Sequence, residues 1–159
     1  MHQGLSVLNK NLQIKAKERF IWNSYHTTNM KKKTNSTADD FPVGSASVIL
    51  IQEQGKILAV SRKGSYGDLG LPGGKIENGE SPISAACREF VEETGKIMCN
   101  PRLVSVVKLK NIKVFVYAAD LIGEIVEHVS EENCLVKWVK PIEICSGTFG
   151  KFNKDNILP

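Results

Sequence analysis

Three glutamates, Glu89, Glu92 and Glu93, stand three and four positions apart in the stretch LPGGKIENGESPISAACREFVEETG, residues 71–95. On a helix these spacings make the side chains neighbours, and like charges there cost roughly a few tenths of a kcal/mol per pair. Three converging carboxylates also form a site for a hard divalent cation, because Mg²⁺ prefers oxygen ligands. We therefore interpret the cluster as a metal site. For Glu92 and Glu93 taken alone, a solvated acidic face is the alternative interpretation.

Residues on either side of the glutamates support the same interpretation. Gly73 and Gly74 allow a close approach of the backbone, since glycine has no Cβ and accepts positive φ. A carbonyl exposed there is a further candidate ligand. Glu80 and Arg88 are placed to pair across the loop–helix junction, and such a pair would hold the carboxylates in position.

The glutamates must be positioned by a helix, which the flanking residues predict over 82–94. Ser81 is a suitable N-cap, Pro82 suits the first turn and Gly95 suits the C-terminal stop. At 100° per residue the carboxylates fall on one face, with Arg88 at its border. The opposite face, expected to pack on a sheet, carries Ile83, Cys87, Phe90, Val91 and Thr94.

The rest of the chain from residue 41 onward reads mainly as strands. Apolar and β-branched runs predict strands over 43–52, 56–62, 102–110, 112–120 and 134–139. Gln54-Gly55 and Asn111 mark hairpin turns, and Pro141 suits the start of a helix at 141–145. Strands, one well-marked helix and a terminal helix predict a mixed α/β domain.

Charge separates the chain into two parts. Residues 1–40 hold seven basic and three acidic side chains, which accounts for the whole formal net charge of +4. We expect residues 1–40 to be a basic, flexible N-terminal arm, with an organelle-targeting peptide as the alternative, and 41–159 to be the domain. The charges of 41–159 cancel, so the basic pI does not indicate a nucleic-acid-binding face.

The hydropathy and the cysteine spacing argue against a membrane span and against a cysteine-based metal site. No run of about 18 apolar residues is present, so no membrane span is expected. The four cysteines, Cys87, Cys99, Cys134 and Cys145, include no C-x-x-C pair and no histidine at metal-ligand spacing. Free thiols and a cytoplasmic location are the expectation.

The central segment also matches a known motif. In order it reads Gly74, five residues, Glu80, seven residues, Arg88-Glu89-Phe90, one residue, Glu92-Glu93, one residue, Gly95. This pattern resembles the Nudix box of the Nudix (MutT-like) hydrolases, and seven fixed positions match by chance on the order of once in 10⁸ placements. One position departs from the family: Lys96 stands where an apolar residue usually follows the last glycine.

The resemblance implies a Nudix-type α/β/α sandwich with a mixed sheet and hydrolysis dependent on Mg²⁺ or Mn²⁺. It implies that Glu89, Glu92, Glu93 and the Gly73 carbonyl bind the metal, while Arg88 and Glu80 orient the helix. The catalytic base is one of these glutamates or a glutamate from a later loop. Candidates in that loop are Glu132, Glu131 and Glu127, each with a solvated acidic turn as the alternative. Lys75, Arg62 and Lys63 are candidate phosphate contacts.

The resemblance implies as substrate a nucleoside diphosphate linked to another moiety. LPGGKIENGE is similar to the group that converts nucleoside triphosphates to monophosphate and pyrophosphate, including enzymes that remove oxidised purines. A base pocket needs an aromatic or apolar wall and an amide. The candidates are Phe149, Phe152, Asn153, Asn156 and Tyr117, with packing of a terminal segment on the sheet as the alternative for each.

Other substrates and another class of function remain open at this stage. They are ADP-ribose or nucleotide sugars, dinucleoside polyphosphates and RNA 5′ ends, the last slightly favoured by the lysine-rich arm. A non-catalytic nucleotide-sensing domain is the alternative of another class, although such a module has no need for the whole set of charged residues.

Overall fold

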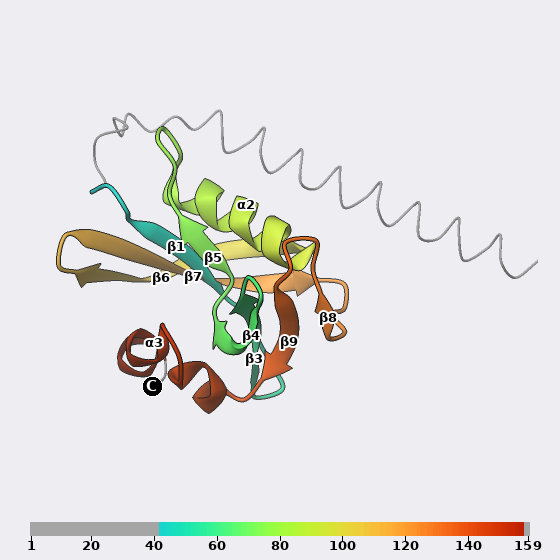
Figure 1. Cartoon of the computed structure of the whole chain (residues 1–159). Coiled ribbons are helices and arrows are strands. Elements are labelled where there is room, and N and C mark those ends of the chain that lie inside the picture. Colours follow the sequence, from blue (N-terminus) through green and yellow to red (C-terminus); the bar gives the residue numbers. More distant parts are fainter. Residues whose placement is uncertain (1–41, 158–159) are drawn as a thin grey trace, which may run out of the picture. The chain divides into compact units, whose positions relative to one another are not determined.

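The fold is seen in a computed structural model that describes residues 42–157 (Figure 1). The expected N-terminal arm, residues 1–40, lies outside the described residues. The elements in chain order are β1 (Ala46–Leu50), β2 (Gln52–Glu53), β3 (Lys56–Arg62), β4 (Ser65–Gly70), β5 (Gly73–Lys75), α2 (Pro82–Thr94), β6 (Ile97–Leu109), β7 (Ile112–Ile122), β8 (His128–Val129), β9 (Leu135–Val139), the 3₁₀ helix η1 (Pro141–Cys145) and α3 (Gly150–Asn156). None of the helices in this part of the chain is long and apolar enough to cross a membrane.

The strands form two sheets. The first has the order β5-β1-β7-β6, with β1 and β7 parallel and the other pairs antiparallel, so it is a mixed sheet. The second has the order β2-β3-β9-β8, with β4 also paired to β3, and all its pairs are antiparallel. The chain crosses between the two sheets three times, from β1 to β2, from β4 to β5 and from β7 to β8.

The expected turn between β2 and β3 is confirmed. Gln54 and Gly55 both have positive φ, 50° and 74°, and the flanking residues pair directly. A two-residue turn of this kind matches the right-handed twist of the strands it joins. The strand expected over 43–52 is corrected, because its two ends belong to different sheets and form β1 and β2.

Three strands were not expected from sequence: β4, β5 and β8. Residues 65–75 are rich in glycine and lack an alternating pattern, but β4 pairs with β3 and β5 with β1. Strand formation depends on such neighbours more than on intrinsic preference. Strand β6 also begins at Ile97, earlier than expected, and Pro101 lies where its pairing with β7 is interrupted, so its missing N–H is tolerated.

Helix α2 has the bounds expected from its caps. The backbone N–H of Ser84 donates to the Ser81 hydroxyl at 3.2 Å. Gly95 ends the helix with φ 64°, and its N–H donates to the Val91 carbonyl at 2.8 Å. These contacts satisfy backbone groups that the helix ends would otherwise leave unpaired.

The packed face of α2 differs in part from the expectation. The buried residues are Ala85, Ala86, Phe90 and Thr94. Ile83, Cys87 and Val91, which were expected in the core, are only half-buried. The two alanines have small side chains that let the helix lie close to the sheet, and Phe90 fills the space between the helix and the sheet.

Two clusters of buried apolar side chains hold the layers together. One joins Ala86 and Phe90 of α2 to strands of both sheets. The other lies beneath η1, where Ile144 packs with Ile57 and Val139. Figure 1 shows α2 and α3 on opposite sides of the strands. The described chain is therefore an α/β fold with a mixed sheet and two α-helices, as expected; the segment 141–145 is a 3₁₀ helix and α3 follows it.

Candidate active site

The carboxylates of α2 lie beside the glycines that precede it. The Gly73 N–H donates to Glu93 Oε2 at 2.8 Å, which ties the end of the helix to β5. Burial is the main cause that raises the pKa of Glu93, to about 8. The hydrogen bond from Gly73 lowers this pKa in part, and repulsion by Glu89, Glu92 and Glu132 raises it further. Four carboxyl groups therefore lie close together, with Glu93 half-buried and Glu92 and Glu132 exposed to water.

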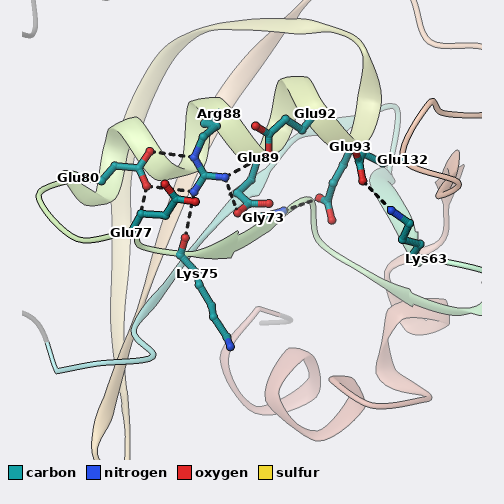
Figure 2. A network of polar contacts seen from close by, with 10 residues as sticks. All are labelled: Lys63, Gly73, Lys75, Glu77, Glu80, Arg88, Glu89, Glu92, Glu93 and Glu132. Atoms are coloured by element: carbon teal, nitrogen blue, oxygen red, sulfur yellow. Dashed lines mark hydrogen bonds and ion pairs between the residues drawn. The ribbon is translucent and has the colours of Figure 1, made fainter.

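Arg88 is the centre of the polar network drawn in Figure 2. Its Nε and Nη2 each donate to a Glu80 oxygen at 3.0 Å, so the expected pair of Arg88 with Glu80 forms and is bidentate. Its Nη1 donates to Glu89 at 2.7 Å and to Glu92 at 3.1 Å, and Nη2 also donates to the Lys75 carbonyl at 3.1 Å. The hydrogen bonds with Glu80, and then the one with Glu89, raise the pKa of Arg88 above its usual range. The network fixes the loop before α2 against the helix.

Both glycines are required by the close approach of backbone and helix. Gly73 has φ +146°, and a Cβ there would lie 2.3 Å from the Ser47 carbonyl oxygen. A Cβ on Gly74 would lie 2.4 Å from the carboxyl carbon of Glu89. Distances this short are not tolerated between non-bonded atoms, so the sheet edge and the Glu89 carboxylate fit together only because neither residue has a side chain.

The turn between β8 and β9 adds a fourth carboxylate. Glu132 pairs with Lys63 of the β3–β4 turn at 3.1 Å (Figure 2). The two turns are held together by Asn133, whose carbonyl accepts from the Gly64 N–H and whose side chain accepts from the Tyr66 hydroxyl at 2.6 Å. Of the later-loop glutamates considered from sequence, the structure thus brings Glu132 to the site.

These side chains line an open cavity of about 330 Å³. Two groups of side chains share it. One consists of the carboxylates Glu89, Glu92, Glu93 and Glu132 with Lys63, and the other consists of the charged Arg62 and Asp68 with the aromatic Phe149. Glu131 and Glu127, the other later-loop candidates, are exposed and do not belong to its lining. The cavity therefore joins the acidic helix face to basic and aromatic side chains from distant segments.

Several candidates named from sequence are not brought to the cavity. Figure 2 shows the Lys75 side chain pointing away from the glutamates, so only its carbonyl joins the network. Asn153 is buried, its amide donates to the Ile144 carbonyl at 2.7 Å, and it is not part of the cavity lining. Of the aromatic and amide candidates for a base pocket, Phe149 is the one in the lining; Tyr117 packs against the α2 core.

Asp68 lines the cavity and was missed from sequence. It lies in SYGDLG, a stretch with no strand pattern and no motif that marks it, and it becomes part of the site because β4 pairs with β3. Cys134 also lines the cavity, and like the other three cysteines it is a free thiol.

The donor atoms of the site are carboxylate oxygens and the backbone carbonyl of Gly73. Within residues 42–157, no three histidine, cysteine or acidic side chains already stand as a ligand set. The physical reason is that Arg88 draws Glu89 and Glu92 toward itself, while the Gly73 N–H holds Glu93. The donor chemistry nevertheless fits a hard divalent cation, because crowded carboxylate oxygens are the ligands such ions prefer and Gly74 leaves room for one of them.

Comparisons with known proteins identify relatives of this chain in sequence and in fold. A MutT-like protein from Streptomyces ambofaciens is 35% identical over 107 residues, covering 65% of this chain and 68% of the relative. The crystal structure of a MutT NUDIX hydrolase from Burkholderia pseudomallei matches with a TM-score of 0.58 and 26% identity, over 72% of this chain and 98% of that one. A MutT protein from Bacillus halodurans, 22% identical, shares the fold with a TM-score of 0.54 over 71% of this chain and 79% of its own. The NUDIX domain model matches residues 42–159, and the chain therefore belongs to the Nudix family of MutT-like hydrolases.

Proposed function

We propose that this chain is a Mg²⁺-dependent pyrophosphohydrolase that converts a nucleoside or deoxynucleoside triphosphate to the monophosphate and pyrophosphate. The observation that carries the proposal is that one cavity is lined by five carboxylates, two basic side chains and an exposed aromatic ring. Carboxylates are suited to a metal, basic groups to phosphates and an aromatic ring to a base. Membership of the Nudix family, whose hydrolases act on pyrophosphate bonds, supports the reaction class.

Glu89, Glu92, Glu93 and the Gly73 carbonyl would hold the cation, Mg²⁺ or Mn²⁺, and Nudix enzymes typically depend on a divalent metal. A bound divalent cation neutralises phosphate oxygens and lowers the pKa of water. The fit rests on the crowded oxygen donors and on the space that Gly74 leaves for Glu89.

The chain's own residues have separate tasks in this proposal. Arg88 and Glu80 hold the carboxylate face against the preceding loop. Lys63 and Arg62 lie on the cavity wall, and Lys63 would contact the phosphates. Glu132 would accept the proton of the attacking water, because it lines the same cavity without being engaged by Arg88. Attack in line with the leaving oxygen then breaks the anhydride bond.

The proposal is tested by identifying products from a panel of nucleotides with Mg²⁺, with Glu93→Gln as the blank. The panel holds ordinary and oxidised deoxynucleoside triphosphates, ADP-ribose, a nucleotide sugar, a dinucleoside polyphosphate and a 5′-triphosphate RNA. Monophosphate and pyrophosphate from the triphosphates support the proposal, and the fastest base identifies the preferred substrate.

The other outcomes of the panel are equally informative. Cleavage of another compound with none of the triphosphates would keep the reaction class and replace the substrate. Absence of cleavage throughout, with folded protein and a Mg²⁺-binding signal, would favour a non-catalytic nucleotide-sensing domain. A Glu93→Gln variant with full turnover would show that the metal assignment is wrong.

A further inference from the structure

A clamp between β4 and the loop before α3 shapes the part of the cavity that the carboxylates do not occupy. Asp68 Oδ1 accepts from the Thr148 backbone N–H at 2.9 Å, and Oδ2 accepts from the Thr148 hydroxyl at 2.6 Å. Both carboxylate oxygens are therefore used on one residue that lies 80 positions away in sequence. Two charge-assisted hydrogen bonds to one partner fix its orientation as well as its position.

The backbone around Thr148 is built for this contact. Gly147 has φ +81°, and a Cβ there would lie 2.3 Å from Asp68 Oδ1, so a glycine is needed to let the carboxylate in. On the other side, the Asn153 N–H donates to the Phe149 carbonyl at 2.9 Å and the Asn153 amide donates to Ile144. The loop is therefore held at both ends, and Phe149 follows the clamped residue directly.

Phe149 presents an apolar ring to a polar cavity. Its side chain lines the cavity and 48% of the residue is exposed. The Arg62 guanidinium lies over the ring, 5.6 Å from its centroid, and Arg62 Nε lies 3.9 Å from Asp68. Asp68 thus contacts both the residue before Phe149 and the cation above its ring. An aromatic ring combined with a guanidinium is a surface on which planar bases stack.

We propose that Phe149 and Arg62 form the surface on which the base of the nucleotide stacks, and that Asp68 is the positioning residue for both, acting on Phe149 through Thr148 and on Arg62 directly. The identity of the ligand as a nucleotide rests on the proposed function. Among the described residues that line the cavity there is no asparagine or glutamine, so the base is selected by stacking area and not by an amide at its edge. Purines therefore bind more tightly than pyrimidines.

The test is equilibrium binding to the full chain, measured by calorimetry with Mg²⁺, of GMP, CMP and ribose 5-phosphate. The last compound has the sugar and phosphate but no base, and none of the three needs turnover. We expect the ratio of the Kd values for ribose 5-phosphate and GMP to fall about tenfold in Phe149→Ala, the loss typical of one stacked base. Phe149→Tyr keeps the ring and restores the ratio.

The positioning role needs a change that leaves the ring intact. Thr148→Val removes the hydroxyl with little change in shape, and Asp68→Asn removes the charge; both should lower the same ratio while ribose 5-phosphate binds as before. Asp155→Asn is the matched control, because Asp155 forms an ion pair with Lys151 on α3 outside the cavity. Thermal unfolding of each variant shows whether the domain is intact.

Two results would overturn the inference. One is a Phe149→Ala variant that loses affinity for GMP and ribose 5-phosphate equally, or not at all. The other is a Thr148→Val variant in which the ratio of the Kd values for ribose 5-phosphate and GMP is unchanged, which would show that Asp68 does not position the stacking surface. Failure of the proposed function has a different signature, since it is judged by wild-type hydrolysis of triphosphates and not by these binding ratios.

Discussion

Replacing Gly74 by alanine tests whether the position of the Glu89 carboxylate controls activity. The new Cβ would lie 2.4 Å from the Glu89 carboxyl carbon and 2.5 and 2.6 Å from its oxygens. Contacts between such atoms normally need about 3.5 Å, so Glu89 must move by about 1 Å. The obstacle is the end of a flexible side chain, and the fold can therefore survive the change.

The size of the effect follows from what Glu89 does in the native site. Its movement breaks the 2.7 Å hydrogen bond from Arg88, at a cost of about 1 kcal/mol and a Tm lower by about 4 °C. A misplacement of about 1 Å in a catalytic site costs on the order of 100-fold in rate. We therefore expect kcat/KM to fall about 100-fold while most of the stability is kept.

The assay is triphosphate hydrolysis over a Mg²⁺ titration, with thermal unfolding of the same samples. Gly79→Ala is the matched control: Gly79 has φ +78° in the loop that follows β5, but a Cβ there meets nothing within 4 Å. It should lose about 1 kcal/mol through backbone strain and keep its activity. Gly74→Ala with wild-type kcat/KM, or Gly79→Ala with the same loss of activity, would refute the reasoning.

Three further predictions follow from individual side chains. Lys63 and Glu132 form an exposed ion pair that contributes under about 1 kcal/mol to stability, so single variants should fold. In steady-state kinetics Lys63→Gln should raise KM several-fold, whereas Glu132→Gln should lower kcat with little change in KM. The reverse pattern would exchange their roles. Asn153→Ala removes the hydrogen bond to the buried Ile144 carbonyl and should lower the free energy of unfolding, measured by urea denaturation, by about 2 kcal/mol. Asn156→Ala, at an exposed position, should change it by less than about 0.5 kcal/mol. Burial, and then the nearby thiol of α2, raises the pKa of Tyr117 to about 12. The neutral phenol is therefore favoured in the folded state, and its contribution to stability, complete below pH 10, is lost as the pH rises through about 12. The difference in phenolate absorbance between the wild-type protein and Tyr117→Phe reports the titration of Tyr117. Its midpoint should lie near 12 in the folded protein and near 10 in denaturant, and equal midpoints would contradict the burial of Tyr117.

Local sequence was enough to predict the helix that carries the carboxylates. Its ends depend on Ser81 and Gly95, which cap their own turn, and its acidic face depends on spacings of three and four residues. The Gln54-Gly55 turn belongs to the same class, since Gly55 readily adopts the positive φ that a two-residue hairpin turn needs. The pairing of Glu80 with Arg88 is also nearly local, spanning eight positions.

The remaining features depend on segments that meet only when the sheets form. β4 and β5 have weak strand signals and exist because β3 and β1 offer unpaired backbone groups beside them. Asn153 was a plausible ligand in sequence, but packing places its amide against the Ile144 carbonyl. Asp68 had no signal at all, because its partner Thr148 lies 80 residues away. Short-range spacing encodes backbone conformation and the face of a helix, whereas the neighbours of a side chain across two sheets are set by how the whole core packs.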